Sequence, residues 1–313
     1  MKKPVLALLA TGVVAALSLT ACGGSASSST DTAKGKELDG LTGVFGAKDF
    51  SEQFILSNIT SQVLNAHGAK TTTNTKVVGS ANVRTAFETG QFAGYWEYTG
   101  TSWITYNKQT KPIKDKKEMF DAVKAADAKK GIAWLDPAPL NNTYAFAIRE
   151  DKAKELNIKS LSDIAKLPAK EQTFCMESEF STRDDGWPGL KKAYGLSPDA
   201  KVSMLDTGVI YTATQKGQDC NFGEVFETDG RISALKLQVM QDDKQFFPIY
   251  QGALTIKADM LAKYPAVADI MAKVSPKLTT EVMQKLNAKA DVDGDDPDKI
   301  ATEWLKSEGL ISE

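Results

Sequence analysis

The sequence predicts an α/β protein of two lobes with a ligand cleft between them, and three observations lead to this fold class. From residue 41 onward, strand-like segments alternate with helix-like segments, which is typical of α/β architecture with largely parallel sheets. About 270 residues follow the first 40, more than one hydrophobic core usually holds. Because no flexible linker interrupts them, we expect ordered strands to connect the lobes, and clefts between such lobes are favoured ligand sites.

In the first half of the chain from residue 41 onward, the spacing of apolar residues and the residues at segment ends indicate which segments are helices and which are strands. A short strand and a turn are expected within 41–50. A helix is expected over 51–68, because its apolar residues fall on one side and Gly68 is suited to end it. The elements expected next are a strand at 75–80, a helix at 81–90, a strand at 92–98, a charged helix at 114–131 and a strand at 132–136.

The same alternation continues in the second half. A strand is expected at 144–150, followed by a helix that starts at Ser160, where Ser160 and Asp163 have the spacing of a capping box. Further strands and helices are expected at 173–178, 186–195 and 201–206, and the stretch from about 267 to 311 is predicted to be mostly helical. We detect no internal repeat.

The N-terminus has the features of an export signal. Two lysines precede an apolar run from Val5 to Leu17 that is too short to span a bilayer comfortably. Leu-Thr-Ala-Cys at 19–22 resembles a bacterial lipobox, so we expect residues 1–21 to be a signal peptide and Cys22 to be lipidated. The alternative is an ordinary signal peptide cut near Ala21. Residues 22–40 are rich in Gly and Ser and predict a flexible tether, which would hold the protein at the extracytoplasmic face of a membrane.

Charge and cysteine content narrow the function classes. Removal of residues 1–21 leaves 36 basic against 40 acidic side chains, and this mildly acidic balance argues against nucleic-acid binding.

Besides Cys22, only Cys175 and Cys220 remain. In an exported protein two such cysteines favour a disulfide, with two buried free thiols as the alternative.

The residue types needed for common catalytic and metal sites are sparse. His67 is the single histidine, and it stands at a predicted helix end, where a structural role fits the helix dipole. The acidic stretch 291–300 does not fit the calcium-binding loop pattern; Asp296 and Pro297 there indicate a helix start. No phosphate-binding glycine motif is present. We therefore expect no enzyme, no metal and no cofactor.

Five stretches combine aromatic residues with polar turns. In chain order they are GAKDFSEQFIL at 46–56, EYTGT at 97–101, LNNTYAFAIR at 140–149, FGEVFETDGRI at 222–232 and FFPIYQGAL at 246–254, with DGWPGLKKAYG at 185–195 as a further segment. Together they resemble the substrate-binding proteins of ABC importers for glycine betaine, choline and carnitine. The resemblance implies a type II periplasmic-binding-protein-like fold, with lobe I at 41–139 plus 245–313 and lobe II at 140–244.

The resemblance also implies an aromatic cage. A quaternary ammonium has no N–H to donate, but aromatic faces attract it, each contact contributing roughly 0.5–2 kcal/mol. Mapped onto this sequence, the cage residues are Tyr98 and Tyr250 from lobe I and Tyr144 and Phe226 from lobe II. Many relatives have tyrosine where this chain has Phe226, so one hydroxyl of the cage is absent.

By the same similarity, Gln53 and Thr101 should face the other end of the ligand. Threonine at 101 is compatible with a broader ligand range than choline alone. The resemblance further implies a monomer that closes around its ligand and delivers it to the permease of an ABC importer. Three alternatives stay open: a binding protein for another betaine such as ergothioneine, an extracytoplasmic sensor or adhesion lipoprotein on the same fold, and a lipoprotein enzyme.

Overall fold

The computed structural model of the chain describes residues 35–111 and 113–312. The proposed signal peptide, the lipidation site Cys22 and most of the proposed tether therefore lie outside the described residues. Leu38 lies within the segment expected to be a tether. Leu38 is fully buried, and its backbone N–H donates to the carbonyl of His67 at 3.1 Å, so the folded body already includes this leucine because its side chain can enter the core.

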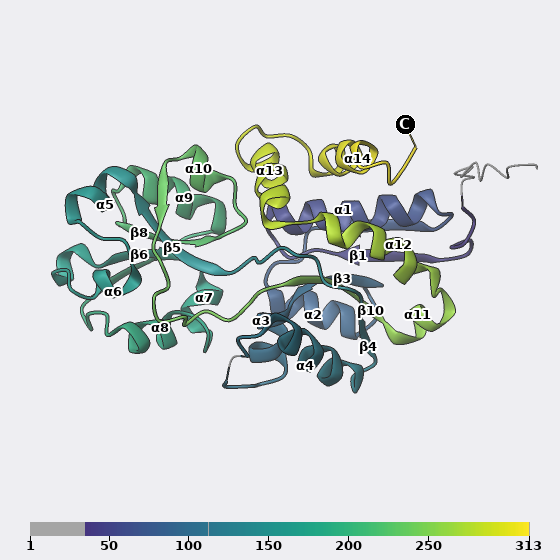
Figure 1. Cartoon of the computed structure of the whole chain (residues 1–313), viewed down its shortest axis with the longest axis horizontal. Helices are drawn as coiled ribbons and strands as arrows, with labels where there is room; N and C mark the ends of the chain where they lie inside the picture. The colour runs from purple at the N-terminus through teal and green to yellow at the C-terminus, as the bar shows by residue number, and fades with distance from the viewer. Residues whose placement is uncertain (1–34, 112, 313) are drawn as a thin grey trace, which may run out of the picture. The chain divides into compact units, whose positions relative to one another are not determined.

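Two five-stranded sheets form the framework of the described part, and we call the regions built on them the first and second lobe (Figure 1). The first sheet has the order β2-β1-β3-β10-β4 and the second the order β7-β6-β8-β5-β9. The first contains β1 (Thr42–Gly46), β2 (Lys70–Asn74), β3 (Gly94–Tyr98), β4 (Ile132–Trp134) and β10 (Gly252–Lys257). The second contains β5 (Tyr144–Arg149), β6 (Thr173–Met176), β7 (Lys201–Met204), β8 (Phe222–Phe226) and β9 (Leu237–Val239).

The expectation of largely parallel sheets is confirmed for strand direction, since four strands of each sheet run the same way and one strand runs against them. β1 is parallel to β2 and β3, and β6 is parallel to β7 and β8. In contrast, β10 runs antiparallel to β3 and β4, and β5 runs antiparallel to β8 and β9. β5 and β10 are the first strands after the chain passes from one lobe to the other. Each therefore enters its sheet at the end where the neighbouring strands leave it.

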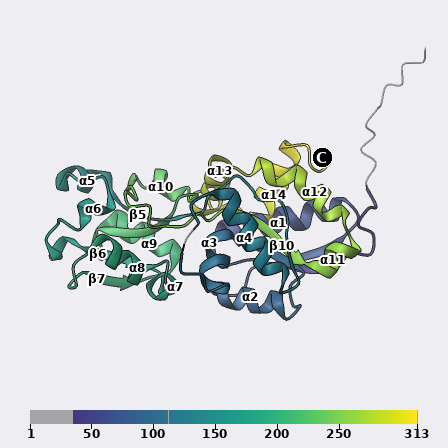
Figure 2. The same cartoon turned by 60° about the horizontal axis from the view of Figure 1, so that its bottom comes forward.

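Helices cover both faces of each sheet (Figures 1 and 2). Those of the first lobe are α1 (Ser51–Ala66), α2 (Ser80–Glu88), α3 (Thr99–Thr101), α4 (Lys116–Ala128), α11 (Ala258–Lys263), α12 (Ala266–Val274), α13 (Thr280–Asp291) and α14 (Pro297–Ser307), with the π-helical turn η1 (Ser102–Tyr106) and the 3₁₀ turn η3 (Ser275–Lys277). Those of the second lobe are α5 (Glu150–Leu156), α6 (Leu161–Ile164), η2 (Ala169–Glu171), α7 (Ser178–Thr182), α8 (Trp187–Tyr194), α9 (Thr207–Lys216) and α10 (Arg231–Ala234).

Most expected elements lie within a few residues of the observed ones, and one is wrong. The helices predicted at 51–68, 81–90 and 114–131 are confirmed, as is the capping box of Ser160 and Asp163. The strand expected at 75–80 is absent from the first sheet. The strand there is β2, five residues earlier, which pairs with β1 through a threonine-rich stretch. The apolar pair at 77–78 suggested a strand, but Val78 is 67% exposed.

Two extended segments, 135–143 and 240–251, connect the lobes. They run side by side: the backbone N–H of Asn142 donates to the carbonyl of Tyr250 at 3.0 Å, and Asn141 forms an antiparallel bridge with Gln251. The side chain of Asn141 accepts the backbone N–H of Tyr250 at 2.8 Å. Hydrogen bonds between the two crossings make them an ordered hinge, as the absence of linker composition predicted.

The core lies on both faces of the first sheet and continues into the second lobe. One apolar cluster packs α1 and α12–α14 against the first sheet and also contains α8 and the facing side of the second sheet. A separate cluster packs α2 and α4 against the opposite face of the first sheet, around Tyr95 and Trp134. In the described part of the chain, no helix has both the length and the apolar content to cross a bilayer.

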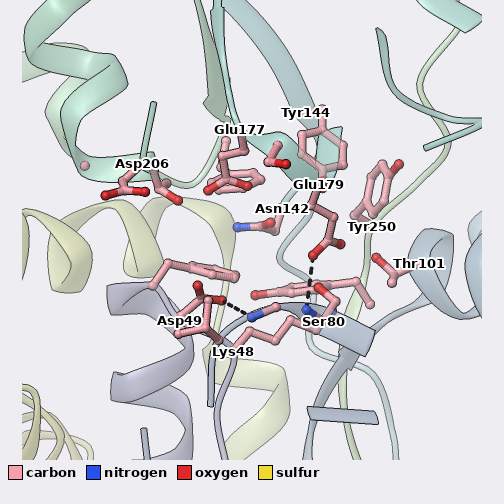
Figure 3. Close-up of a pocket in the computed structure, with 18 of the residues that line it drawn as sticks. Lys48, Asp49, Ser80, Thr101, Asn142, Tyr144, Glu177, Glu179, Asp206 and Tyr250 are labelled. Atoms are coloured by element: carbon pink, nitrogen blue, oxygen red, sulfur yellow. Dashed lines mark hydrogen bonds between the residues drawn. The ribbon is translucent and has the colours of Figure 1, made fainter. Parts of the chain in front are cut away.

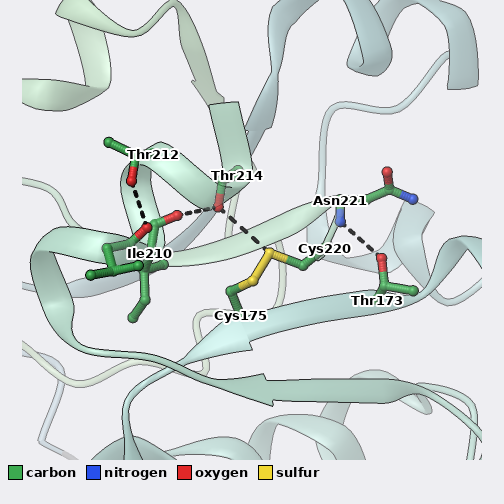
Figure 4. Close-up of a disulfide and its surroundings, with 8 residues drawn as sticks. Thr173, Cys175, Ile210, Thr212, Thr214, Cys220 and Asn221 are labelled. Atoms are coloured by element: carbon green, nitrogen blue, oxygen red, sulfur yellow. Dashed lines mark hydrogen bonds between the residues drawn. A yellow bond between two sulfur atoms is a disulfide. The ribbon is translucent and has the colours of Figure 1, made fainter. Parts of the chain in front are cut away.

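Cys175 and Cys220 form a disulfide in the second lobe (Figure 4). Cys175 lies in β6, and Cys220 lies two residues before β8, the strand that pairs with β6. Both cysteines are buried. The bond therefore closes a segment of 45 residues that contains α7, α8, β7 and α9.

Candidate functional site

A cavity of about 560 Å³ lies between the lobes, within the range of roughly 300–1,000 Å³ typical of small-molecule sites. Figure 3 shows side chains from both lobes around it. The first lobe contributes the loop after β1, the loop before α2, the end of β3 and α3. The second lobe contributes the start of β5, the loops after β6 and β7, and the end of β8. The hinge contributes Asn142 and Tyr250.

All four aromatic residues expected to form the cage line this cavity, and they occupy strand ends. Tyr98 ends β3, Tyr144 begins β5 and Phe226 ends β8, while Tyr250 lies on the crossing two residues before β10. Tyr144 and Phe226 are directly opposite each other in the sheet, with ring centroids 5.2 Å apart. The rings of Tyr144 and Tyr250 meet edge to face, also at 5.2 Å.

The stretch 97–106 leads from the first sheet into the lining of the cavity. It begins at the end of β3, continues as α3 and then forms a π-helical turn, a backbone feature that often accompanies functional sites. Gly100 lies against the ring of Tyr250, where an added Cβ would approach ring carbons to 2.8 Å. Thr99 donates its hydroxyl to the carbonyl of Ile249 at 2.8 Å. Small residues here let the first lobe pack directly on the hinge, and Thr101 lines the cavity as expected from the resemblance.

Buried carboxylates hold the hydroxyl groups of two cage tyrosines. The Tyr98 hydroxyl donates to Glu52 at 2.6 Å. The Tyr250 hydroxyl donates at 2.5 Å to Asp185, which is itself paired with Arg183 at 2.6 Å. Burial raises the pKa of both tyrosines well above the ordinary range, so these hydroxyls stay protonated and remain donors.

Lys48 is the one cation among the described lining residues. Its ammonium group forms a 2.6 Å ion pair with buried Glu97 and lies 4.9 Å from the centroid of the Tyr98 ring. Glu97 also accepts the Tyr95 hydroxyl at 2.7 Å and is fully buried. Glu97 therefore neutralises Lys48 and is not available to a ligand cation.

Four carboxylates line the cavity, one from the first lobe and three from the second (Figure 3). They are Asp49, Glu177, Glu179 and Asp206. Glu179 pairs with Arg183 at 2.9 Å and accepts the backbone N–H of Ser80 in the first lobe at 3.1 Å. Burial and the neighbouring carboxylates raise the pKa of Glu177 to about 7. The lining thus carries an excess of negative charge, which favours a cationic guest.

The position of Gln53 differs from the expectation, and two other residues were not predicted. Gln53 is not among the lining residues; its side chain is buried, with Oε1 accepting the backbone N–H of Lys48 at 3.4 Å. It lies in the first turn of α1 and packs against the loop after β1. Phe50 lines the cavity and stacks on Phe226 at 5.2 Å. Asn142 also lines it, and the Asn-Asn-Thr-Tyr stretch was the available signal for it.

Asp229, His67 and Asp296 have structural positions outside the cavity. Asp229 accepts from the backbone and guanidinium of Arg231 at 2.9 Å, as a turn residue does. His67 caps the end of α1 and lies 3.3 Å from Glu37. Asp296 caps α14, with Pro297 in its first turn. None of these three lines the cavity.

Aromatic faces, buried acceptors and excess negative charge suit a weakly hydrated cation. Two α/β lobes joined by paired crossings around such a cavity define a solute-binding protein of the type II architecture. A family model for the substrate binding domain of ABC-type glycine betaine transport system matches residues 44–307. The chain belongs to this family, whose members are substrate-binding components of importers rather than enzymes.

Individual relatives agree with this assignment. The chain is 36% identical over 277 residues to the glycine-betaine-binding protein of Pseudomonas aeruginosa, covering 86% of this chain and 88% of that protein. It is 32% identical over 268 residues to a Helicobacter pylori protein named ergothioneine transport permease/ergothioneine binding protein EgtU, covering 85% of this chain and 48% of that protein. A crystal structure of a glycine betaine/carnitine/choline ABC transporter matches with a TM-score of 0.72 and 30% identity, covering 86% of this chain and 99% of that chain.

Proposed function

We propose that this protein captures a quaternary ammonium compatible solute, of the glycine betaine, choline or carnitine class, in the aromatic cage of Tyr98, Tyr144, Phe226 and Tyr250. One observation supports this most strongly: four rings from both lobes and the hinge line a single cavity. A cage of rings selects a bulky, weakly hydrated cation over a small, strongly hydrated one, because the free-energy cost of removing water is smaller for the weakly hydrated cation.

The rings belong to different parts of the fold, so the ligand stabilises a closed arrangement of the lobes. Tyr98 is fixed to the first sheet and Phe226 to the second. A cation that contacts both contributes more free energy to the closed form than to the open form, and this difference drives closure. Thr101 supplies a hydroxyl group for the polar end of the ligand.

A second candidate ligand is ergothioneine, a betaine with a larger body. The relative from Helicobacter pylori, named for this compound, favours it. The same rings would hold its trimethylammonium group, and the cavity volume of about 560 Å³ leaves room for a ring at the other end.

We further propose that the mature chain is a monomer anchored by lipid at Cys22 on the extracytoplasmic face, from which it delivers its ligand to the permease of an ABC importer. The lipobox-like sequence at 19–22 supports the anchor. Mass spectrometry of the mature protein should show acyl chains on a new N-terminal Cys22, and Cys22→Ala should release the protein from the membrane. An unmodified N-terminus cut near Ala21 would contradict the anchor.

Isothermal titration calorimetry on residues 23–313, which contain the compact unit from 34 onward, tests the ligand class. The panel is glycine betaine, choline, carnitine, proline betaine and ergothioneine, with proline and glycine as controls that lack a quaternary nitrogen. Saturable heat from at least one quaternary amine, and none from the controls, is the expected result. A folded protein that gives no heat with any of them would contradict the proposed function and favour a sensor or another solute.

A further inference from the structure

Glu52, the buried carboxylate that holds the Tyr98 hydroxyl, has further contacts that link several parts of the site. It lies in the first turn of α1 and is 2% exposed. Burying a carboxylate costs free energy unless hydrogen bonds or opposite charges compensate it. Its hydrogen-bond partners among the described residues are neutral, and burial raises its pKa above the ordinary value. The positive end of the α1 dipole offsets part of this cost.

The partners of Glu52 lead directly to the cage. Its Oε1 accepts the Tyr98 hydroxyl at 2.6 Å and the side-chain amide of Asn142 at 3.0 Å. Its Oε2 accepts the amide of Asn287, on α13, at 3.1 Å. Two residues that line the cavity, one from β3 and one from the hinge, therefore share a single carboxylate oxygen.

Asn142 extends this network into the second lobe. Its side-chain amide also donates to the hydroxyl of Thr228 at 2.7 Å. Asn142 precedes Tyr144 by two residues and Thr228 follows Phe226 by two, so this bond continues the pairing of β5 with β8 beyond the sheet. The backbone N–H of Asn142 donates to the carbonyl of Tyr250. Each of the four cage residues is thus within two residues of a group in this network.

We propose that Glu52 is the positioning residue of the cage. It holds the Tyr98 ring through the hydroxyl and, through Asn142, holds the strand ends that carry the second-lobe rings. Donation from the phenol to a carboxylate also enriches the Tyr98 ring in electrons, which strengthens its attraction for a cation. This inference rests on the proposed function, because positioning is measured by the affinity for a quaternary amine.

The test compares Glu52→Gln with a matched control on the same helix. Glu52→Gln keeps the shape but replaces one carboxylate oxygen by a donor, which opposes either the Asn142 amide at one oxygen or the Asn287 amide at the other, and it removes the negative charge. Thr60→Val removes a buried hydrogen bond of 2.9 Å from α1 to Trp96 of β3, without touching a cage residue. We expect Glu52→Gln to weaken quaternary-amine binding by about tenfold, the contribution of one charge-assisted hydrogen bond. Thr60→Val should lower the melting temperature but leave the affinity unchanged.

A double-mutant cycle identifies the route of the effect. In a Tyr98→Phe background, where the hydroxyl is absent, Glu52→Gln should cost less affinity than in the wild type. Equal costs in both backgrounds, or wild-type affinity of Glu52→Gln, would overturn the proposal. The same holds if Thr60→Val weakens binding as much as Glu52→Gln does.

A ligand-free measurement separates this inference from the proposed function. In protein labelled with ¹³C-tyrosine, the Tyr98 ring should flip measurably faster in Glu52→Gln than in the wild type. If the wild type binds no quaternary amine, the proposed function fails while the ring-flip rates still decide the positioning role. Identical flip rates would overturn that role whatever the ligand is.

Discussion

At the scale of single residues, the cage rings differ in what holds them. Tyr98 and Tyr250 are fixed by their hydroxyls to carboxylates, whereas Phe226 has no hydroxyl and is held by stacking on Phe50. The guanidinium of Arg183 lies 5.5 Å from the Tyr144 ring centroid, so a resident cation already occupies one side of that ring.

Removal of a ring should weaken binding according to the cation–π contribution. Tyr250→Ala and Phe226→Ala should each reduce the affinity for a quaternary amine by about tenfold, since such contacts contribute roughly 0.5–2 kcal/mol. Calorimetry measures this, with Phe246→Ala, an aromatic residue outside the cavity lining, as the control. Affinities that fall equally in all three variants would argue against a cage.

The raised pKa of Glu177 predicts a pH dependence. Its pKa is about 7 in the folded protein against an ordinary value of 4.5, so the carboxylate becomes charged as the pH rises through 7. Choline affinity should therefore increase on the order of threefold between pH 6 and pH 8, and Glu177→Gln should flatten the increase. Because the pKa of Glu177 is higher in the folded than in the unfolded protein, the folded protein holds this proton more tightly. The free energy of unfolding should therefore fall as the pH rises from about 4.5 to about 7. A wild-type affinity that does not change with pH would contradict this role.

At the scale of elements, α2 receives its N-terminal cap from the other lobe. Its own N-cap residue, Gly79, has no side chain, and the N–H of Ser80 donates to Glu179 on α7. Glu179→Gln should weaken the closed form and reduce ligand affinity by about fivefold, the effect of losing about one helix cap. Asp115→Ala, which removes the cap that α4 receives within its own lobe, is the control. The Asp115 variant should lower the stability of the protein and leave the ligand affinity unchanged. If Glu179→Gln and the Asp115 variant bind the ligand equally well, the cap does not contribute to ligand binding.

The disulfide stabilises the second lobe without reaching the cavity. Its 45-residue separation corresponds to roughly 4 kcal/mol of lost chain entropy in the unfolded state. The double variant Cys175→Ser with Cys220→Ser should melt about 10 °C lower, measured by calorimetric scanning, and bind its ligand with unchanged affinity. A large loss of affinity at a temperature where the variant is folded would show that the bond also shapes the site.

Element positions were predictable where apolar spacing is regular, and not where it is misleading. The pattern of α1 and α4 indicated both helices, but β2 has the sequence Lys-Thr-Thr-Thr-Asn, which carries no apolar alternation. Its strand character comes from β-branched residues paired with β1. The direction of β5 and β10 was also outside the reach of local pattern, because strand direction depends on where the chain re-enters each sheet.

At the scale of the whole molecule, the order of motifs predicted the site better than any single motif. The four cage residues are 46, 82 and 24 positions apart in turn along the sequence, yet all line one cavity. Phe50 and Glu52 escaped prediction because their motif directed attention to Gln53, their neighbour. Which side chain of residues 50–53 faces the cavity depends on how the start of α1 packs, and this is a property of the assembled lobes.

A crystal structure with the ligand that binds best would show whether the quaternary nitrogen lies among rings from both lobes. We expect the nitrogen within about 6 Å of the ring centroids of Tyr98, Tyr144, Phe226 and Tyr250, with Glu179 still bonded to Ser80. A ligand bound elsewhere, or with its nitrogen among the carboxylates and away from the rings, would contradict this expectation.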